Sequence, residues 1–352
     1  MNQLTSHVAT RIVVRPIEES PTQIEAWKRF VDQHPLATTD HQWGWRRILS
    51  ESFGFAPHYL GAWSGQTLVG ILPLFRVPRG WRRWALCSIP FGNYGGICAE
   101  SEEAAQALLE EAKALLGRAG AAYLELRHRM PLADERLQAR PLHTRFYLPL
   151  THTPEHHLQQ LGGKNHKRIT KALHEGVRLV VRRDLDALFA IHAHTFRRLG
   201  SPCFPRRYFE LILEDLPSEI LFAAVGEQLI AYRLVLLFKD CLVSQFAGSL
   251  TPYLHYHPNH VLWWFEIQRA YEGGFKEIDQ CRSRLNSGSA DFKRTLRMAE
   301  EPLHYQYLVS DGRLPSTRSP SNPRYRWLIA TWQRLPLAVT QLLGPKVVKY
   351  FA

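Results

Sequence analysis

The chain has 352 residues, of which 45% are hydrophobic, 22% are charged and 11% are aromatic. This length and balance are typical of about two globular domains and exclude a disordered or fibrous chain. The longest apolar stretch, residues 221–238, is interrupted by Glu227, Gln228 and Arg233. It therefore does not predict a membrane-spanning helix, which needs about 20 nearly uninterrupted apolar residues.

The formal net charge of +12 is unevenly distributed. Residues 311–352 carry seven basic side chains and one acidic one, and a second basic cluster contains Lys164, Lys167, Arg168 and Lys171. Positive patches of this kind favour an anionic partner such as a phosphate-bearing substrate, RNA or a lipid surface. A solvated basic face that aids solubility is the alternative, and the sequence leaves both open.

The first residues of the sequence and its cysteines indicate a cellular location. The first residues lack a basic head followed by an apolar core, so we expect no signal peptide. The five cysteines are scattered and include no C-x-x-C pair, which is typical of a reduced protein. We therefore expect a cytoplasmic protein.

The predicted elements of the first half are two helices, a β-hairpin, a helix and a strand. In chain order they span residues 22–32, 42–52, 59–63 with 68–75, 102–116 and 120–125. A hairpin is predicted because Gly65 opens a short turn between two apolar runs.

The second half repeats this order at residues 185–199, 206–216, 220–225 with 229–238, 259–271 and 274–279. The pattern G-x-x-L-[VI]-[GA] occurs at 65–70 and 226–231, and G-x-x-x-[LI]-[DE] at 120–125 and 274–279. Four kinds of element in the same order predict a duplicated α/β unit with mixed sheets.

Three segments follow from the breaks between these elements. We expect an N-terminal domain at 1–150, a C-terminal domain at 151–310, and a linker with a basic helical tail at 311–352. Residues 310–323 are rich in Ser, Pro and Gly, as in a flexible connector. The tail helices, at 325–335 and 337–351, combine Trp and Tyr with Arg and Lys, which fits either an interfacial amphipathic helix or a tail packed on the body.

Short motifs occur in both halves. In the first half they are His34-Pro35, Phe53-Gly54-Phe55, Leu72-Pro73-Leu74 and the run 90–96 (PFGNYGG). In the second half they are Leu199–Pro202, Ala247-Gly248-Ser249, Pro258-Asn259, Arg282-Ser283 and Phe292-Lys293. In combination they resemble the FemAB-like family over nearly the whole chain. The tail, with Asn322-Pro323 and Leu343-Gly344-Pro345, is similar to the subgroup linked to exosortase/PEP-CTERM exopolysaccharide systems.

This resemblance implies a tandem duplicated GNAT-like acyltransferase fold with a C-terminal basic helical tail. It also implies transfer of an acyl or aminoacyl group to an amine of a cell-envelope, exopolysaccharide or peptidoglycan-type precursor. The acceptor would be a nucleotide- or lipid-linked glycan or peptide. The donor would be aminoacyl-tRNA or acyl-CoA, so tRNA is an expected partner, and no permanently bound cofactor is expected.

The sequence gives less support to acyl-CoA than to aminoacyl-tRNA as the donor. CoA-using members of the wider superfamily present a Q/R-x-x-G-x-G/A loop whose backbone N–H groups hold the pyrophosphate. Neither Gly248-Ser249 with the following residues nor Gly92-x-x-Gly95-Gly96 has this pattern. A CoA donor is therefore less supported, although acetyl-CoA-dependent N-acetylation remains an alternative function.

Lys293 and Asp279 are the candidate catalytic residues. Acyl transfer to an amine needs stabilisation of the developing oxyanion but no covalent nucleophile. Lys293 matches the Phe-Lys pair of FemAB transferases, and a lysine there could stabilise the oxyanion or the leaving oxygen. The alternative is an exposed lysine on a short helix. Asp279 either orients substrate together with Arg282 or forms a buried ion pair at the strand end.

Further candidates would bind substrate. Lys164, Lys167 and Arg168 begin a helix and could hold a phosphate group. The family motifs add a second set: Arg282, Ser283, Asn259, Tyr94, Gly95, Gly96 and Ser249. The family usually has glycine where this chain has Cys281, so the acceptor pocket is expected to differ there.

Other chemistries are less supported. The histidines at 255, 257 and 260 lack an acidic or thiolate partner at ligand spacing, and we expect no metal site. No nucleophile elbow is present, and DNA is not an expected partner. A non-catalytic module that binds a glycan precursor at the inner membrane face, with residues 324–352 as a peripheral contact, stays open as a different class of function.

Overall fold

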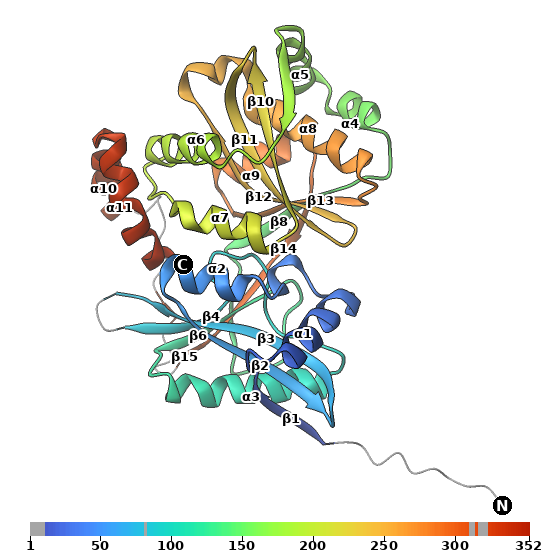
Figure 1. Ribbon diagram of the computed structural model, residues 1–352, viewed down its shortest axis with the longest axis vertical. Coiled ribbons are helices and arrows are strands. Elements are labelled where there is room, and N and C mark those ends of the chain that lie inside the picture. Colours follow the sequence, from blue (N-terminus) through green and yellow to red (C-terminus); the bar gives the residue numbers. More distant parts are fainter. Residues whose placement is uncertain (1–10, 81–82, 310–313, 316–322) are drawn as a thin grey trace, which may run out of the picture.

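The computed structural model describes residues 11–80, 83–309, 314–315 and 323–352, and the side chains of 323–325 are not among the described parts. Two mixed sheets, each flanked by helices, lie one beyond the other along the molecule (Figure 1). The predicted α/β class with a duplicated unit is confirmed. Most of the predicted linker at 310–323 lies outside the described residues.

The first sheet has the strand order β1-β2-β3-β4-β6-β15-β7, with β5 beside β3. Its strands are β1 (Ile12–Pro16), β2 (Ala56–Ser64), β3 (Thr67–Pro78), β4 (Trp84–Ser88), β5 (Cys98–Ala99), β6 (Tyr123–His128), β7 (Gln138–Arg140) and β15 (His304–Val309). Alternate side chains of a strand face opposite sides. Thus α3 (Glu102–Arg118) covers one face, and α1 (Pro21–Gln33) with α2 (Trp45–Phe53) covers the other.

The second sheet has the order β14-β8-β13-β12-β11-β10-β9. Its strands are β8 (His143–Pro149), β9 (Val177–Val181), β10 (Ser218–Val225), β11 (Gln228–Phe238), β12 (Cys241–Ser249), β13 (Glu277–Arg284) and β14 (Ala299–Pro302). One face packs on α8 (Pro258–Glu272), and the other on α6 (Leu185–Arg198) and α7 (Arg206–Asp215).

The remaining α-helices of the described residues are α4 (Pro154–Leu161), α5 (Gly163–His174), α9 (Gly288–Thr295), α10 (Pro323–Arg334) and α11 (Leu337–Val348). The 3-10 turns are η1 (Thr39–His41), η2 (Thr251–Tyr256) and η3 (Lys349–Phe351).

Both predicted hairpins are present. Strand β2 pairs with β3 around Gly65, and β10 pairs with β11 around Gly226. These glycines have φ of 60° and 55°, a left-handed conformation that glycine adopts without steric cost. The repeated G-x-x-L pattern therefore marks the same turn in each half.

The sheets exchange strands where the two halves meet. Strand β8 precedes the expected boundary at residue 150, yet it pairs with β13 in the second sheet. Strand β15 follows the second unit and pairs with β6 in the first sheet. Each half is thus completed by a strand from the other, which ties the two together.

The halves also share a hydrophobic core. Helices α2 and α7 pack against each other at the junction, and one buried cluster includes Ile48 and Phe53 as well as Leu211 and Phe222. At the rim, Arg47 forms ion pairs with Glu214 and Asp215. A continuous hydrophobic core therefore holds the two halves together at their junction.

The tail helices pack on the body through α6. The Nε of Arg197 donates to the carbonyl of Leu335 at 2.6 Å, and the side-chain amide of Gln333 donates to the carbonyl of Arg198 at 2.9 Å. Their outer faces keep apolar side chains exposed. Among the described residues, no helix is both long enough and apolar enough to span a bilayer.

Candidate functional site

Strands β12 and β13 diverge in the middle of the second sheet. They pair in parallel from Cys241–Val243 to Glu277–Asp279, although β12 continues to Ser249 and β13 to Arg284. Strand β13 bulges after Asp279, and Cys281 there has a φ of 57°. That conformation is costly for a residue with a side chain, and such strain clusters at functional sites. Beyond Val243 and Asp279 the two strands no longer pair with each other.

Lys293 supports this bulge from α9. Its Nζ donates to the carbonyl of Gln280 at 2.5 Å and contacts that of Cys281 at 3.5 Å. The side chain is buried, with 8% of its surface exposed, so the alternative of an exposed lysine does not hold. Burial lowers the pKa of Lys293 to about 8. A buried lysine with a lowered pKa thus contacts the bulge at which the two strands part.

A buried polar network continues from the bulge into the core. The side-chain amide of Gln280 donates to Ser244 Oγ at 2.9 Å and to Glu266 at 2.5 Å. Arg233 lies 3.3 Å from Glu266. Burial raises the pKa of Glu266. These partners fix the Gln280 side chain, and with it the backbone carbonyl that Lys293 contacts.

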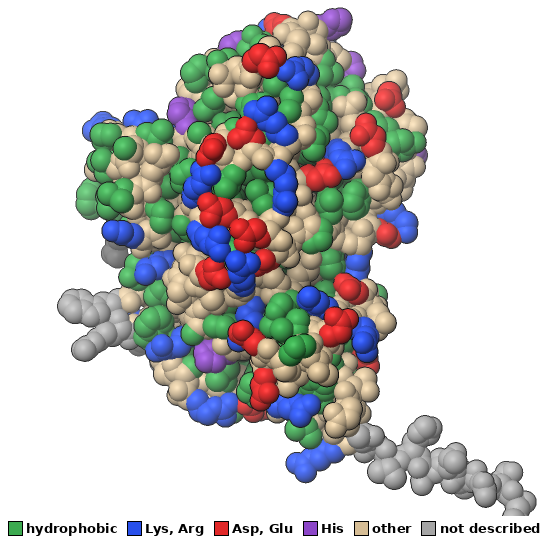
Figure 2. Space-filling view, in the orientation of Figure 1, with side chains coloured by type: hydrophobic (Ala, Val, Ile, Leu, Met, Phe, Trp, Pro, Cys, Tyr) green, Lys and Arg blue, Asp and Glu red, His purple; other side chains and the backbone are tan. Residues whose placement is uncertain are grey.

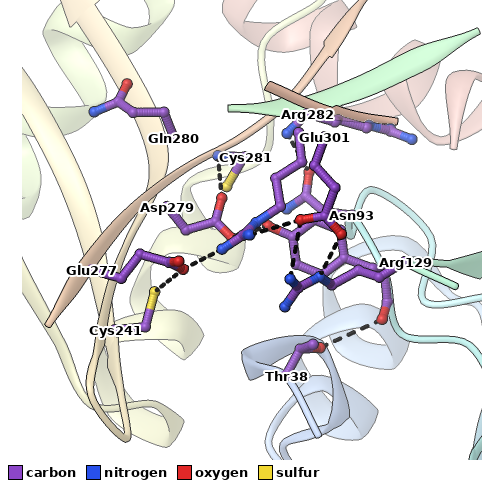
Figure 3. A network of polar contacts seen from close by, with 12 residues as sticks. Thr38, Asn93, Arg129, Cys241, Glu277, Asp279, Gln280, Cys281, Arg282 and Glu301 are labelled. Atoms are coloured by element: carbon purple, nitrogen blue, oxygen red, sulfur yellow. Dashed lines mark hydrogen bonds and ion pairs between the residues drawn. The ribbon is translucent and has the colours of Figure 1, made fainter. Parts of the chain in front are cut away.

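Asp279 is the centre of a second buried network. Its carboxylate accepts a hydrogen bond from Arg145 Nε at 2.8 Å and another from the backbone N–H of Cys281 at 2.7 Å. Arg145, on β8, is 2% exposed and also pairs with Glu277 and with Glu301 on β14. Asp279 therefore forms a buried ion pair, and its guanidinium partner is Arg145 rather than Arg282. Figure 3 shows Glu277, Asp279 and Glu301 within this network of polar contacts.

The first half reaches this network through the loop after β4. The hydroxyl of Tyr94 donates to Asp279, and burial followed by the nearby Asp279 raises the pKa of Tyr94 well above its usual value. Asp40, in η1, accepts hydrogen bonds from the backbone N–H groups of Asn93 and Tyr94 at 2.7 and 2.8 Å. The carboxylate of Asp40 thus anchors the loop, and Tyr94 of the same loop forms a hydrogen bond with the carboxylate of Asp279.

Gly95 and Gly96 allow this close approach. A Cβ on Gly95 would lie 2.5 Å from Ile89, and one on Gly96 would lie 2.2 Å from the ring of His128. The carbonyl of Gly96 lies 2.9 Å from Nε2 of His41. The run PFGNYGG is therefore a packed element of the junction, and its glycines are needed for space.

Asp40 predicts a pH effect on stability. Its Oδ1 is buried without a hydrogen-bond partner among the described residues, and burial raises the pKa of Asp40. The folded protein then binds more protons than the unfolded chain above about pH 3.9, so this carboxyl lowers stability as pH rises. We expect the unfolding free energy of Asp40→Asn, relative to the parent, to increase from pH 4 to pH 7 in urea titrations. Asn at the exposed Asp186, whose side chain is 86% exposed, is the control; an equal rise there would contradict the assignment.

Cys241, Glu277 and Asp279 place three ligand-type atoms within 4.8 Å of one another. Both carboxylates are already paired with Arg145. Burial raises the pKa of the Cys241 thiol, which disfavours the thiolate that metals bind. A guanidinium occupies the position that a cation would take, so the group does not fit a metal centre.

The sequence-predicted residues fall into two groups. One lies at the junction and comprises Lys293, Asp279, Arg282, Ser283, Tyr94, Gly95 and Gly96. In it, the backbone N–H of Arg282 donates to Asn93 at 3.3 Å, and the hydroxyl groups of Ser283 and Ser289 are 3.0 Å apart.

The other group lies at the outer end of the second half. Arg168 Nη1 is 3.4 Å from His260, so Lys164, Lys167 and Arg168 on α5 adjoin Asn259 at the start of α8. Lys164, Lys167 and Asn259 are exposed. Ser249 lies apart from both groups, where its Oγ is 3.5 Å from Arg198. These residues are not brought together with Lys293.

Sequence reasoning missed Arg145, Asp40 and the buried partners of Gln280. The sequence did contain a signal for Arg145: it is a charged residue directly before the apolar run FYLPL, residues 146–150. Asp40 carried none, because only the folded loop places Asn93 and Tyr94 beside it.

Comparisons with known proteins agree with this architecture. Residues 164–294 match the acetyltransferase (GNAT) domain family. A crystal structure of FemX is similar over 90% of this chain and 100% of its own, at 12% identity and a TM-score of 0.63. The structure of L-PGS from Bacillus licheniformis is similar over 94% and 98%, at 13% identity and a TM-score of 0.57.

A tandem GNAT protein from the clavulanic acid biosynthesis pathway is similar over 87% of this chain and 100% of its own, at 12% identity and a TM-score of 0.53. No curated protein matches the sequence. At such identities the structures establish the fold alone. The chain therefore has a tandem GNAT-like fold, in which residues 164–294 are similar to a GNAT acetyltransferase domain.

Proposed function

We propose that the protein is an acyltransferase that moves an acyl or aminoacyl group onto an amino group of a nucleotide- or lipid-linked cell-envelope or exopolysaccharide precursor. The observation that carries this proposal is the divergence of β12 and β13, where a buried lysine lies against the bulge. The match of residues 164–294 to an acetyltransferase domain supports it. The membership of an exosortase/PEP-CTERM subgroup rests on the sequence resemblance of the tail.

The mechanism proposed is direct attack of the amine on the donor's ester or thioester carbonyl. The new amide C–N bond forms, the donor's C–O or C–S bond breaks, and the amine proton passes to solvent or to the leaving group. Lys293 would stabilise the negative charge that develops on the carbonyl oxygen. Burial, followed by the nearby Asp279, raises the pKa of Cys281 well above its usual value, which disfavours a covalent thiolate route.

The donor is proposed to be aminoacyl-tRNA, with acyl-CoA as the second candidate. The segment after β12 passes through η2 into α8 without the glycine-rich loop of CoA enzymes. Basic Lys164, Lys167 and Arg168, beside the start of α8, would suit the phosphates of either donor.

The test offers the purified chain labelled acetyl-CoA and a labelled charged-tRNA pool, each with a mixture of amine acceptors. Transfer of label from charged tRNA alone supports the aminoacyl reaction. Transfer from acetyl-CoA alone makes the protein a small-molecule N-acetyltransferase. If neither donor binds or transfers label, the enzyme proposal is overturned and the binding-module alternative takes its place.

A second candidate role is peripheral contact with the inner membrane face through residues 324–352. Trp327, Leu342 and Phe351 are 65%, 67% and 51% exposed, and Arg326, Arg334 and Lys346 are exposed near them. Figure 2 shows hydrophobic side chains gathered on α10 and α11 with basic side chains around them. Such a face suits an anionic lipid surface.

This contact predicts vesicle binding. We expect Trp327→Ser with Leu342→Ser to weaken sedimentation with anionic vesicles about tenfold or more, because two large apolar side chains would no longer enter the interface. Leu36→Ser, at an exposed leucine of the first half, should leave sedimentation unchanged. Equal binding by all three proteins would contradict a membrane role for the tail.

A further inference from the structure

Five arginines converge on one cavity at the junction of the halves. The cavity has a volume of about 250 Å³, and its charged lining consists of Arg79, Arg127, Arg140, Arg282, Arg284 and Glu125. They come from the loop after β3 and from β6, β7 and β13. Segments far apart in the chain thus bring like charges together at one place.

The one acidic side chain of the lining, Glu125, already has arginine partners. Glu125 lies 2.8 Å from Arg127 and 3.5 Å from Arg79. Among the described residues, Arg140, Arg282 and Arg284 have no carboxylate partner; Arg140 donates to the carbonyl of Pro315 and Arg282 to the hydroxyl of Tyr305. Like charges in a partly desolvated pocket repel one another, so this excess of arginine side chains favours the binding of an anion.

Tyrosine rings hold four of these guanidinium groups in place. Arg127 and Arg282 lie 5.5 Å from the ring of Tyr305, Arg79 lies 5.8 Å from Tyr123, and Arg140 lies 5.8 Å from Tyr307. Such contacts fix the orientation of the donors before a ligand arrives. Arg79 also donates to a backbone oxygen of Ala352, the last residue of the sequence, so its guanidinium already meets an oxygen acceptor in the cavity.

We infer that this cavity binds a phosphate or diphosphate group. Guanidinium groups match phosphate oxygens in pairs, and arginine is the side chain best suited to this recognition. The volume accommodates a diphosphate, and the tyrosine walls suit an attached ring. No sequence motif marked this site, although Arg282 was expected to bind substrate.

The cavity adjoins the point where the strands diverge. Arg282 lines it, and the preceding residue, Cys281, has the carbonyl that Lys293 contacts at 3.5 Å. The phosphate would therefore belong to the acceptor of the transfer reaction, a link that rests on the proposed function. The exposed apolar side chains of Tyr350 and Phe351 also line the cavity, which suits a lipid-linked phosphate.

Calorimetric titration of the full chain with inorganic pyrophosphate, at constant ionic strength, tests the site. We expect Arg284→Gln and Arg140→Gln each to weaken binding about tenfold or more, the loss typical of a charged hydrogen bond. Arg118→Gln, at an exposed arginine paired with Glu111, is the matched control and should bind like the parent. No measurable pyrophosphate binding, or equal binding by all variants, would overturn the inference.

Two further arms identify the source of the phosphate. Titration with UDP tests a nucleotide, and sedimentation with phosphatidylcholine vesicles containing a polyprenyl diphosphate tests a lipid. Sensitivity of either interaction to Arg284→Gln supports the site and names its source; insensitivity of both overturns the link to the acceptor. These readouts measure binding, so absence of acyl transfer with intact pyrophosphate binding would refute the proposed function and leave the site standing.

Discussion

Replacing Lys293 with methionine is expected to reduce acyl transfer about 100- to 1,000-fold, the typical cost of removing one group that stabilises a developing oxyanion. The variant should still fold. The pKa of Lys293 falls from 10.5 to about 8 in the folded protein, so burial of the charged form costs stability below pH 8 and this cost disappears as pH rises toward 10.5. Methionine removes that cost and offsets the lost contacts to Gln280 and Cys281. Transfer rates and urea unfolding at pH 7 measure the two effects.

The pH profile separates a catalytic cation from a structural one. If the charged lysine acts in the reaction, transfer by the parent should decline as pH rises through about 8. Arginine at 293 stays charged in this range, so any transfer it retains should show no such decline. Lys276→Met, at an exposed lysine, is the control. Near-normal turnover by Lys293→Met would rule out the proposed role.

Replacing Arg145 with alanine is expected to lower the unfolding free energy by about 3–5 kcal/mol, the usual cost of breaking a buried ion pair from one side. Arg145 is 2% exposed and lies 2.8 Å from Asp279 and 3.0 Å from Glu301. Its loss would leave Asp279, itself 2% exposed, as an uncompensated charge. Urea unfolding at pH 7 measures the difference.

A second variant keeps this prediction testable if Arg145→Ala does not fold. Arg145→Met combined with Asp279→Asn removes charge from both partners, and we expect it to recover a large part of the lost stability. Arg118→Ala, at an exposed pair, should cost about 0–1 kcal/mol. A loss at Arg145 no larger than that at Arg118 would show that the network does not stabilise the junction.

Local patterns accounted for most of the elements. Gly65 and Gly226 predicted the two hairpins because only a left-handed turn residue connects such closely spaced strands. The helices predicted at 102–116 and 259–271 correspond to Glu102–Arg118 and Pro258–Glu272, since their caps and periodic apolar residues lie within the same few turns. The strand exchange of β8 and β15 was not predicted, because strand pairing depends on contacts far apart in the chain.

In the candidate site, too, some residues could be predicted from local motifs and others could not. Lys293, Asp279 and Arg282 were predicted from short motifs, and the structure brings them to one junction. Their partners could not be found so: Asp279 pairs with Arg145, 134 residues away, and Tyr94 reaches it from the other half. The basic residues Lys164, Lys167 and Arg168 were correctly placed at the start of a helix, but nothing in the sequence indicated that this helix lies at the outer end of the second half.

The sequence by itself determined the duplicated α/β unit, its hairpin turns, the basic tail and the identity of the candidate lysine, because each depends on residues close together in the chain. The tertiary structure alone decided that Lys293 is buried, that Arg145 neutralises Asp279 and that five arginines share a cavity. Those properties arise from desolvation and from the distances between charges. Both quantities are set only when strands and loops distant in sequence pack together.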